Sequence, residues 1–191
     1  LKKAILCGFL AGDGNIHIRK EVSNYEVRFF PDDDEMLAIY FEVIQSIYGQ
    51  TPSIFLKNNY YYLRLTSKIV VKDICNYADF GLYSWTLPHS LFQSDEAKIL
   101  WLKAFFSAEA YVGPRSIKVQ TVNLPAMKEV SNLLLDLGIE NKYYEFNPKQ
   151  KAWSKVGIVF INKKKARKLF YEKIGFWHEK KNIALLRSLN L

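Results

Sequence analysis

Hydrophobic and polar positions in the first half of the chain predict the element order helix, strand, strand, helix, strand, strand, helix. The first helix is apolar on nearly every side, which indicates burial on several faces. The strands alternate apolar and polar residues, and the second helix begins with acidic residues and ends before a glycine. In chain order, the predicted elements cover residues 5–12, 15–19, 25–30, 32–48, 53–57, 61–66 and 68–80.

The second half of the chain repeats this order. Both halves open with an apolar run that ends in a small residue, an acid and a small residue, GDG at residues 12–14 and AEA at residues 108–110. We therefore expect an α+β protein built from two pseudo-symmetric αββαββα repeats, the first covering residues 1–88 and the second residues 89–191. The elements predicted in the second repeat cover residues 99–110, 116–121, 124–137, 142–146, 156–161 and 163–174.

Each apolar run also carries a stripe of small residues at helical spacing. Such stripes allow two helices to approach closely. Helices packed in this way bring their last turns together, so we expect Asp13 and Glu109 to face each other near a pseudo-twofold axis. Two carboxylates at helix C-termini repel unless hard cations bind between them, and Mg²⁺ held by such a pair activates water for phosphodiester hydrolysis. The stripes are Gly8, Ala11 and Gly12 in the first run and Ala104, Ser107 and Ala108 in the second.

The purely structural interpretation of Asp13 and Gly14 is a helix end followed by a turn, because Asp-Gly pairs most often form turns. The acid recurs at the same place in the second repeat as Glu109, without a glycine beside it. Recurrence of the charge without the turn residue favours a chemical role for the two carboxylates.

These residues resemble a known motif. Residues 6–14, LCGFLAGDG, and residues 102–110, LKAFFSAEA, resemble the two LAGLIDADG motifs of monomeric homing endonucleases, which are usually encoded within introns or inteins. The resemblance implies two antiparallel sheets that form a saddle on duplex DNA, with the motif helices at their interface. It also implies that Asp13 and Glu109 hold Mg²⁺ for cleavage of both strands, that Mn²⁺ substitutes for Mg²⁺, and that Ca²⁺ binds without supporting cleavage.

Two departures from the motif lie in its second copy, where Ala104 and Ala110 replace the usual glycines. Alanine at position 104 still permits the close packing of two helices. Alanine at position 110 requires a negative φ, since the left-handed region is costly for a residue with a side chain. Neither change removes the carboxylate of Glu109.

A third departure concerns a lysine that the family often places shortly after the last helix of each repeat, near the scissile phosphate. The second repeat offers Lys181 or Lys180 at this place. The matching stretch of the first repeat, residues 81–88, has no basic residue. The resemblance therefore implies that Lys181 is catalytic, and that the other cleavage centre either lacks a lysine or borrows one, such as Lys68.

Polar and aromatic residues alternate along the predicted strands and give a candidate DNA surface. Arg, Asn and Gln can make bidentate contacts with bases, whereas Lys mainly meets phosphate. Either alternating set of strand 25–30 can face outwards, and the bland interpretation of the whole surface is a solvated sheet face. The candidates are Asn15, His17, Arg19, Arg28, Lys57, Tyr62 and Arg64 in the first repeat and Arg115, Lys118, Gln120, Lys149, Lys151, Trp153 and Lys155 in the second.

The positive charge of the chain is distributed unevenly between the two repeats. The chain has 27 Lys and Arg against 19 Asp and Glu, a net charge of +8, which favours a polyanionic partner. Residues 1–88 contribute 9 basic and 10 acidic residues, so the excess belongs wholly to the second repeat. We expect most phosphate contacts, and most of the salt dependence of binding, to come from that repeat.

The chain shows neither a disulfide framework nor the ligand spacing of a zinc site, and its two cysteines are expected to be buried free thiols. The basic and apolar N-terminus lacks a small-x-small cleavage site, and no apolar stretch approaches the ~18 residues of a membrane span. We therefore expect a protein that binds no membrane, is not secreted, and resides in the cytoplasm or, in a eukaryote, an organellar matrix. The resemblance to two-motif homing endonucleases implies a monomer.

Two other functions would use the same basic saddle. An RNA maturase would assist splicing of its host intron by binding intron RNA, and it would not need the carboxylates. A catalytically inactive DNA-binding module would have lost cleavage, an interpretation to which only the missing lysine of the first repeat points. Intact acids in both motifs favour the double-strand endonuclease over these alternatives.

Overall fold

The computed structural model describes residues 1–57, 60–148 and 154–190, and it confirms the predicted order of helices and strands. The first half consists of α1 (Lys2–Asp13), β1 (Gly14–Arg19), β2 (Asn24–Phe29), α2 (Asp34–Tyr48), β3 (Ser53–Lys57), β4 (Tyr60–Thr66) and α3 (Lys68–Cys75). The second half consists of α4 (Asp95–Glu109), β5 (Tyr111–Gly113), β6 (Ser116–Thr121), α5 (Leu124–Asp136), β7 (Lys142–Phe146), β8 (Val156–Ile161), α6 (Lys164–Lys173) and α7 (Glu179–Leu189). Short 3-10 turns lie at Lys20–Val22 and His89–Leu91.

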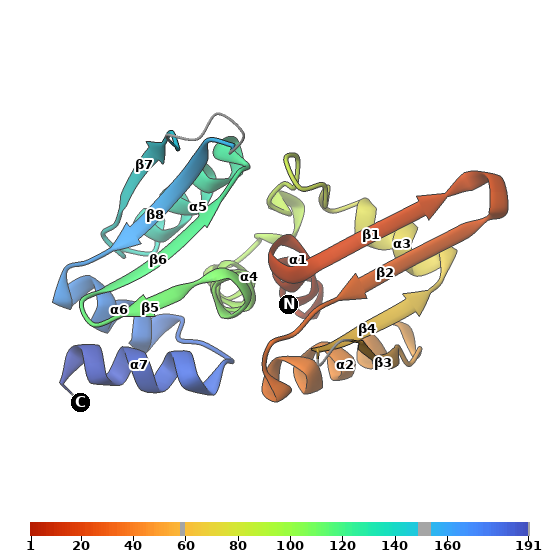
Figure 1. Cartoon of the computed structure of the whole chain (residues 1–191), viewed down its shortest axis with the longest axis horizontal. Coiled ribbons are helices and arrows are strands. Elements are labelled where there is room, and N and C mark those ends of the chain that lie inside the picture. Colours follow the sequence, from red (N-terminus) through yellow and green to blue (C-terminus); the bar gives the residue numbers. More distant parts are fainter. Residues whose placement is uncertain (58–59, 149–153, 191) are drawn as a thin grey trace.

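Each half forms its own four-stranded antiparallel sheet (Figure 1). The strand order is β1-β2-β4-β3 in the first sheet and β5-β6-β8-β7 in the second, so the two sheets share one topology. The molecule is therefore the α+β protein with two equivalent repeats that the sequence predicts. The exact division of the repeats at residue 88 stays a prediction.

Three elements differ from the prediction. α3 ends at Cys75 rather than at residue 80, because the Asn76 amide bonds back to carbonyls of the last turn and the chain then leaves the helix. β5 spans three residues, which is too short for alternation to reveal. α7 lies beyond the predicted elements, although two of its leucines are buried.

α1 and α4 pack against each other at the centre of the molecule, and the two sheets spread outwards on either side (Figure 1). A methyl group added to Gly8 would lie 2.4 Å from the carbonyl oxygen of Trp101 and 2.8 Å from Cβ of Ala104. A methyl group added to Gly12 would lie 2.6 Å from Cβ of Ala108. The small-residue stripes are therefore the contact line between the helices, with no room for larger side chains.

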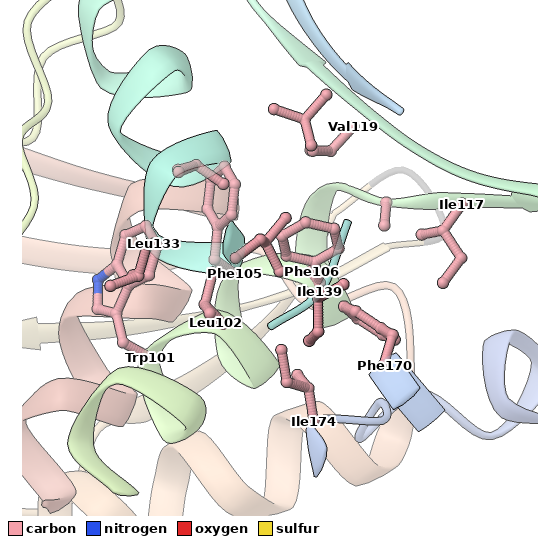
Figure 2. Close-up of a cluster of buried hydrophobic side chains, with 14 of the residues drawn as sticks. Trp101, Leu102, Phe105, Phe106, Ile117, Val119, Leu133, Ile139, Phe170 and Ile174 are labelled. Carbon is pink, nitrogen blue, oxygen red and sulfur yellow. The ribbon is translucent and has the colours of Figure 1, made fainter. Parts of the chain in front are cut away.

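The two central helices also share their side chains between two hydrophobic cores. Ala4 and Cys7 of α1 contact the core of the second repeat, whereas Ala104 and Ala108 of α4 contact the core of the first. In the second core, side chains of α4, α5, β6 and α6 converge (Figure 2). Separation of the repeats would therefore expose apolar residues of both cores to water.

Both cysteines are free thiols. Cys7 is buried as predicted, but Cys75 is exposed, because the buried stripe of α3 runs through Val70, Val71 and Ile74 and leaves it out. Within the described ranges, no helix combines the length and apolar character needed to cross a bilayer.

Gly8 gives a direct test of the contact between α1 and α4. Alanine in a helix interior normally stabilises by about 1 kcal/mol relative to glycine. Here Gly8→Ala should instead lower the free energy of unfolding by about 2 kcal/mol, because its methyl group meets the Trp101 carbonyl. Urea denaturation measures the difference. Lys2→Ala, at an exposed position of the same helix, is the control and should change the value by less than about 0.5 kcal/mol.

Candidate functional site

Asp13 and Glu109 are the last residues of α1 and α4. A methyl group on Gly12 would lie 3.3 Å from Cγ of Glu109, so the two helix ends, and with them the two acids, lie side by side. The chain leaves each helix as extended backbone, with φ of −101° at Gly14 and −79° at Ala110. Alanine at position 110 requires a negative φ, and the structure has one.

Burial raises the pKa of both carboxyl groups above their ordinary values. The pKa of Asp13 rises to about 6, chiefly because of desolvation and secondly because of the charge of Asp32. The pKa of Glu109 rises to about 7, again chiefly through desolvation and secondly through the charge of Asp13. Ionising both acids at neutral pH therefore opposes folding, and a bound cation would relieve that opposition.

Lys181 reaches this pair of acids from α7. Its Nζ donates hydrogen bonds to the carbonyl oxygens of Ser107 at 2.6 Å and Ala108 at 2.9 Å, in the last turn of α4. Its charge lowers the pKa of both acids, and burial lowers its own pKa. Of the two lysines that the sequence offers, Lys181 thus lies at the acids, whereas Lys180 lines a separate cleft beside the start of α2.

At the position that matches Lys181 in the sequence, the first repeat has an apolar residue. Leu87 follows Gly81 by the same number of residues as Lys181 follows Gly175, and it is 3% exposed in the second core. A cavity of about 520 Å³ lies next to Glu109 on this side, and the linker that follows α3 forms one of its walls. The two sides of the acid pair are therefore chemically unlike.

Lys68 does not replace the missing lysine. Its Nζ lies 5.4 Å from the centroid of the Tyr25 ring. Tyr25 pairs with Ile18 near the outer end of β1, whereas Asp13 precedes the inner end of that strand. At ~3.3 Å per strand residue, Ile18 is about 16 Å along the chain from Asp13, so Tyr25 and Lys68 lie towards the end of the strand that is remote from the acids.

Side chains that the sequence analysis overlooked join the two repeats beside Lys181. His178, at the start of α7, is 6% exposed, and its ring nitrogens lie 3.3 Å from a carboxylate oxygen of Asp33 and 3.6 Å from one of Asp32. Asp33 also caps α2 by accepting a hydrogen bond from the amide of Glu35. The start of α7 thus lies against the start of α2, and α7 carries Lys181. In the sequence, the acidic residues 32–35 were the only sign of this contact with His178. Capping of the helix that follows them explains their presence equally well.

The acid pair fits a magnesium ion by the chemistry of its donors. Among residues 1–57, 60–148 and 154–190, no group of three or more His, Cys, Asp or Glu side chains is placed to hold a metal ion. Asp13 and Glu109 supply two carboxylates, which are hard oxygen donors. Mg²⁺ commonly binds through one or two carboxylates and completes its shell with water and substrate phosphate, so two ligands from the protein suffice.

The candidate DNA-binding residues of the first repeat lie on one face of the first sheet. Val27 and Phe29 are buried, so the outward set of β2 is the one that contains Arg28. The strand register places Asn15, Arg28 and Arg64 in one row across β1, β2 and β4. The same face carries His17, Arg19, Tyr62 and Lys57.

In the second repeat, Lys118 and Gln120 lie on the outward face of β6. Their neighbours Ile117 and Val119 point into the core (Figure 2). Arg115 is exposed in the turn between β5 and β6. The sheet therefore presents Lys118 and Gln120 away from its covering helices, whereas Arg115 lies outside the strands and its contact with DNA stays a prediction.

The hairpin between β7 and β8 is described only in part. Lys149, Lys151 and Trp153 lie outside the described residues, so their contacts with DNA stay predictions. Lys155 is described, and its ammonium group pairs with the carboxylate of Glu145. A portion of the charge that was expected to meet phosphate is thus already neutralised by the protein.

Comparison with known proteins finds a family match in the second repeat and structures of similar fold over nearly the whole chain. Residues 96–175 match the family described as a LAGLIDADG-like domain. The homing endonuclease I-DmoI, in complex with DNA and Mn, superimposes with a TM-score of 0.72 and 18% identity over 91% of this chain and 96% of that chain. The homing endonuclease I-WcaI, bound to its DNA recognition sequence, gives a TM-score of 0.64 and 14% identity over 98% of this chain and 85% of that chain.

A curated relative shows a likeness of another kind. The glutamine–fructose-6-phosphate aminotransferase of Methanocaldococcus jannaschii is 26% identical to this chain over 193 residues. The match covers 97% of this chain but 17% of that protein. The chain therefore spans about a sixth of the length of the curated relative it matches.

The raised pKa values predict how the metal-free protein responds to pH. A carboxyl group whose pKa is higher in the folded than in the unfolded state stabilises the fold only while it is protonated. This contribution to the free energy of unfolding is fully present below about pH 4 and is lost as the pH rises through the pKa of the folded state. Since Glu109 has a folded pKa of about 7, Glu109→Gln should raise the free energy of unfolding at pH 8 by about 2 kcal/mol and leave it nearly unchanged at pH 4.

Urea denaturation in the presence of EDTA, at both pH values, measures this effect. Glu42→Gln removes a carboxylate from an exposed position in α2 and is the matched control, with an expected change below about 0.5 kcal/mol at pH 8. Equal effects of the two substitutions at pH 8 would contradict the assignment of Glu109 as a destabilising group.

Proposed function

We propose that this LAGLIDADG protein is a site-specific endonuclease that cuts both strands of a DNA duplex. One observation carries the proposal: two half-buried carboxylates from different repeats meet at the close contact between α1 and α4, where their ionisation opposes folding. Groups held in a position that costs stability are typical of catalytic sites. The LAGLIDADG-like domain and the fold shared with two homing endonucleases support the same conclusion.

Asp13 and Glu109 would hold the divalent cation between the repeats. When bound, Mg²⁺ activates water and stabilises the departing oxygen of the phosphodiester. The chain fixes the two acids through a close helix contact. Lys181 of α7 holds its ammonium group against the last turn of α4, where it would stabilise negative charge on a bound phosphate. We propose that Mn²⁺ can replace Mg²⁺ and that Ca²⁺ binds without cleavage. In support, complexes with DNA have been solved for I-DmoI with Mn and with Ca, and for a variant of I-DmoI with Mg.

The outward faces of the two sheets are proposed to lie along the DNA, on either side of the acids. Strand register gathers the polar candidates of the first repeat on one such face, and Lys118 and Gln120 lie on the other. Because α1 and α4 lie between the sheets, cleavage is expected at the centre of the target (Figure 1). A single chain contains both repeats and both acids, so a monomer suffices for double-strand cleavage.

The alternatives make different use of the same surface. A maturase would bind intron RNA without needing Asp13 or Glu109, and an inactive module would not need to retain two acids that oppose folding. The aminotransferase activity of the curated relative is not extended to this chain, because the match covers 17% of that protein. An intron as the coding element, and the cytoplasm or an organellar matrix as the location, remain part of the proposal.

The carboxylates should be needed for cutting but not for binding. Asp13→Asn and Glu109→Gln should each lower double-strand cleavage by at least about 100-fold, because each removes a charged metal ligand. DNA affinity should change less than about threefold. Cleavage of a target plasmid with Mg²⁺ and a mobility-shift assay with Ca²⁺ measure the two properties. Glu42→Gln is the control and should cut normally, whereas full cleavage by both site variants would refute the role of the acids.

Lys181 should act mainly on one strand, since Leu87 occupies the matching place in the first repeat. Lys181→Met should slow cleavage of the DNA strand nearest Lys181 by about 100-fold and leave the other strand unaffected. Because one strand is then cut long before the other, nicked circles should accumulate before linear DNA. Lys180→Met, at an exposed neighbouring position, should leave both rates unchanged. Gel analysis of a supercoiled plasmid distinguishes the outcomes, and an equal slowing of both strands would show that Lys181 serves both centres.

A further inference from the structure

The outward faces of the two sheets differ in their chemistry. Their members follow from the strand registers, because residues paired across strands point to the same side of a sheet. The first face consists of Asn15, His17, Arg19, Asn24, Glu26, Arg28, Ser53, Phe55, Lys57, Tyr60, Tyr62, Arg64 and Thr66. The second face consists of Tyr111, Gly113, Ser116, Lys118, Gln120, Lys142, Tyr144, Phe146, Val156, Ile158 and Phe160.

Two arginines at the centre of the first face are held in place by their neighbours. Arg28 is ion-paired with Glu26, to which its Nε donates a 2.9 Å hydrogen bond, and the guanidinium of Arg64 lies 4.4 Å from the centroid of the Phe55 ring. The Phe55 ring in turn stacks on Tyr62 at 5.0 Å. Arg28 and Arg64 are register partners on adjacent strands. The guanidinium groups of both arginines are therefore oriented in the DNA-free protein, which reduces the entropy that they lose on binding.

The second face has no arginine among its described members. Its two basic groups are the lysines of β6 and β7, Lys118 and Lys142, which suit phosphate better than a base edge. Between and beside them, apolar and aromatic side chains line β8 and β7. Tyr144 is 44% exposed and Phe146 is 51% exposed, so these rings are accessible to a ligand rather than covered by the protein.

These two surfaces suit different base pairs. A guanidinium fork matches O6 and N7 of guanine, and this is the commonest specific contact in the major groove. Apolar and aromatic groups instead contact the methyl group of thymine. An exposed apolar strip that meets DNA favours a base pair that itself offers an apolar group, because a purely polar groove edge would be desolvated without compensation.

We propose that the target consists of two chemically unlike half-sites, with G·C pairs under the first face and T·A pairs under the second. This inference rests on the proposed function, since it assumes that both faces bind one duplex. Within the first half-site, Arg64 and Arg28 are the principal specificity-determining residues. Within the second, Tyr144, Phe160 and Phe146 take that role, and Lys118 and Lys142 supply affinity that does not depend on sequence.

Selection of bound duplexes from a random library, with the intact chain and Ca²⁺, tests the inference. The selected sequences should show G·C preference in one half and T·A preference in the other. Arg64→Ala should reduce the G·C preference at one or two positions by about tenfold and leave the other half unchanged, since a bidentate pair contributes ~1–3 kcal/mol of discrimination. Tyr144→Ala should weaken only the T·A preference.

Ile54→Ala is the matched control, because Ile54 is exposed on the opposite side of the first sheet and should leave the selected sequences unchanged. Binding with the same base composition in both halves, or G·C preference in the half that responds to Tyr144→Ala, would overturn the inference and leave the proposed function intact. A failure to bind any duplex would overturn both.

Discussion

The contact between α1 and α4 is the constraint on which the rest of the structure depends. Gly8 and Gly12 let the helix backbones approach until an added methyl group would collide with the facing helix. This approach places the ends of the two helices together, and with them Asp13 and Glu109. It also places a sheet on each side of the acids (Figure 1), so the geometry of the DNA surface and that of the candidate catalytic site have one origin.

The same contact creates an electrostatic conflict. Two acids at helix C-termini, partly removed from water, ionise less readily than exposed carboxyl groups, and their pKa values of about 6 and about 7 express this cost. Lys181 relieves the conflict in part, and it belongs to α7, whose start lies beside Asp32 and Asp33 of the first repeat. A cation at the acids would complete the neutralisation, which is why the arrangement suits metal-dependent chemistry.

The sequence predicts the duplication well because two motifs, small-residue stripes and matching strand patterns agree over the whole chain. It misses α7 because that helix has no counterpart in the first repeat, and it overextends α3 because no glycine or proline marks the end at Cys75. It leaves Lys180 and Lys181 undecided, since only the packing of α7 on α4 decides which amine reaches the Ser107 carbonyl. The Asp33 and His178 contact joins residues far apart in the chain, and no local pattern announces it.

The two sheets therefore share one topology, whereas the side chains around them differ between the repeats. Leu87 stands at the sequence position that matches Lys181. The arginines of the first sheet face have no counterpart among the described members of the second, although both faces carry aromatic rings. The central claim is that the acids act on DNA held across both faces. Mapping both strand breaks on a duplex selected for binding, with Mg²⁺ present, tests it most directly. The account predicts breaks at the centre of the footprint, between the two half-sites; breaks at one end, or none on a tightly bound duplex, would contradict it.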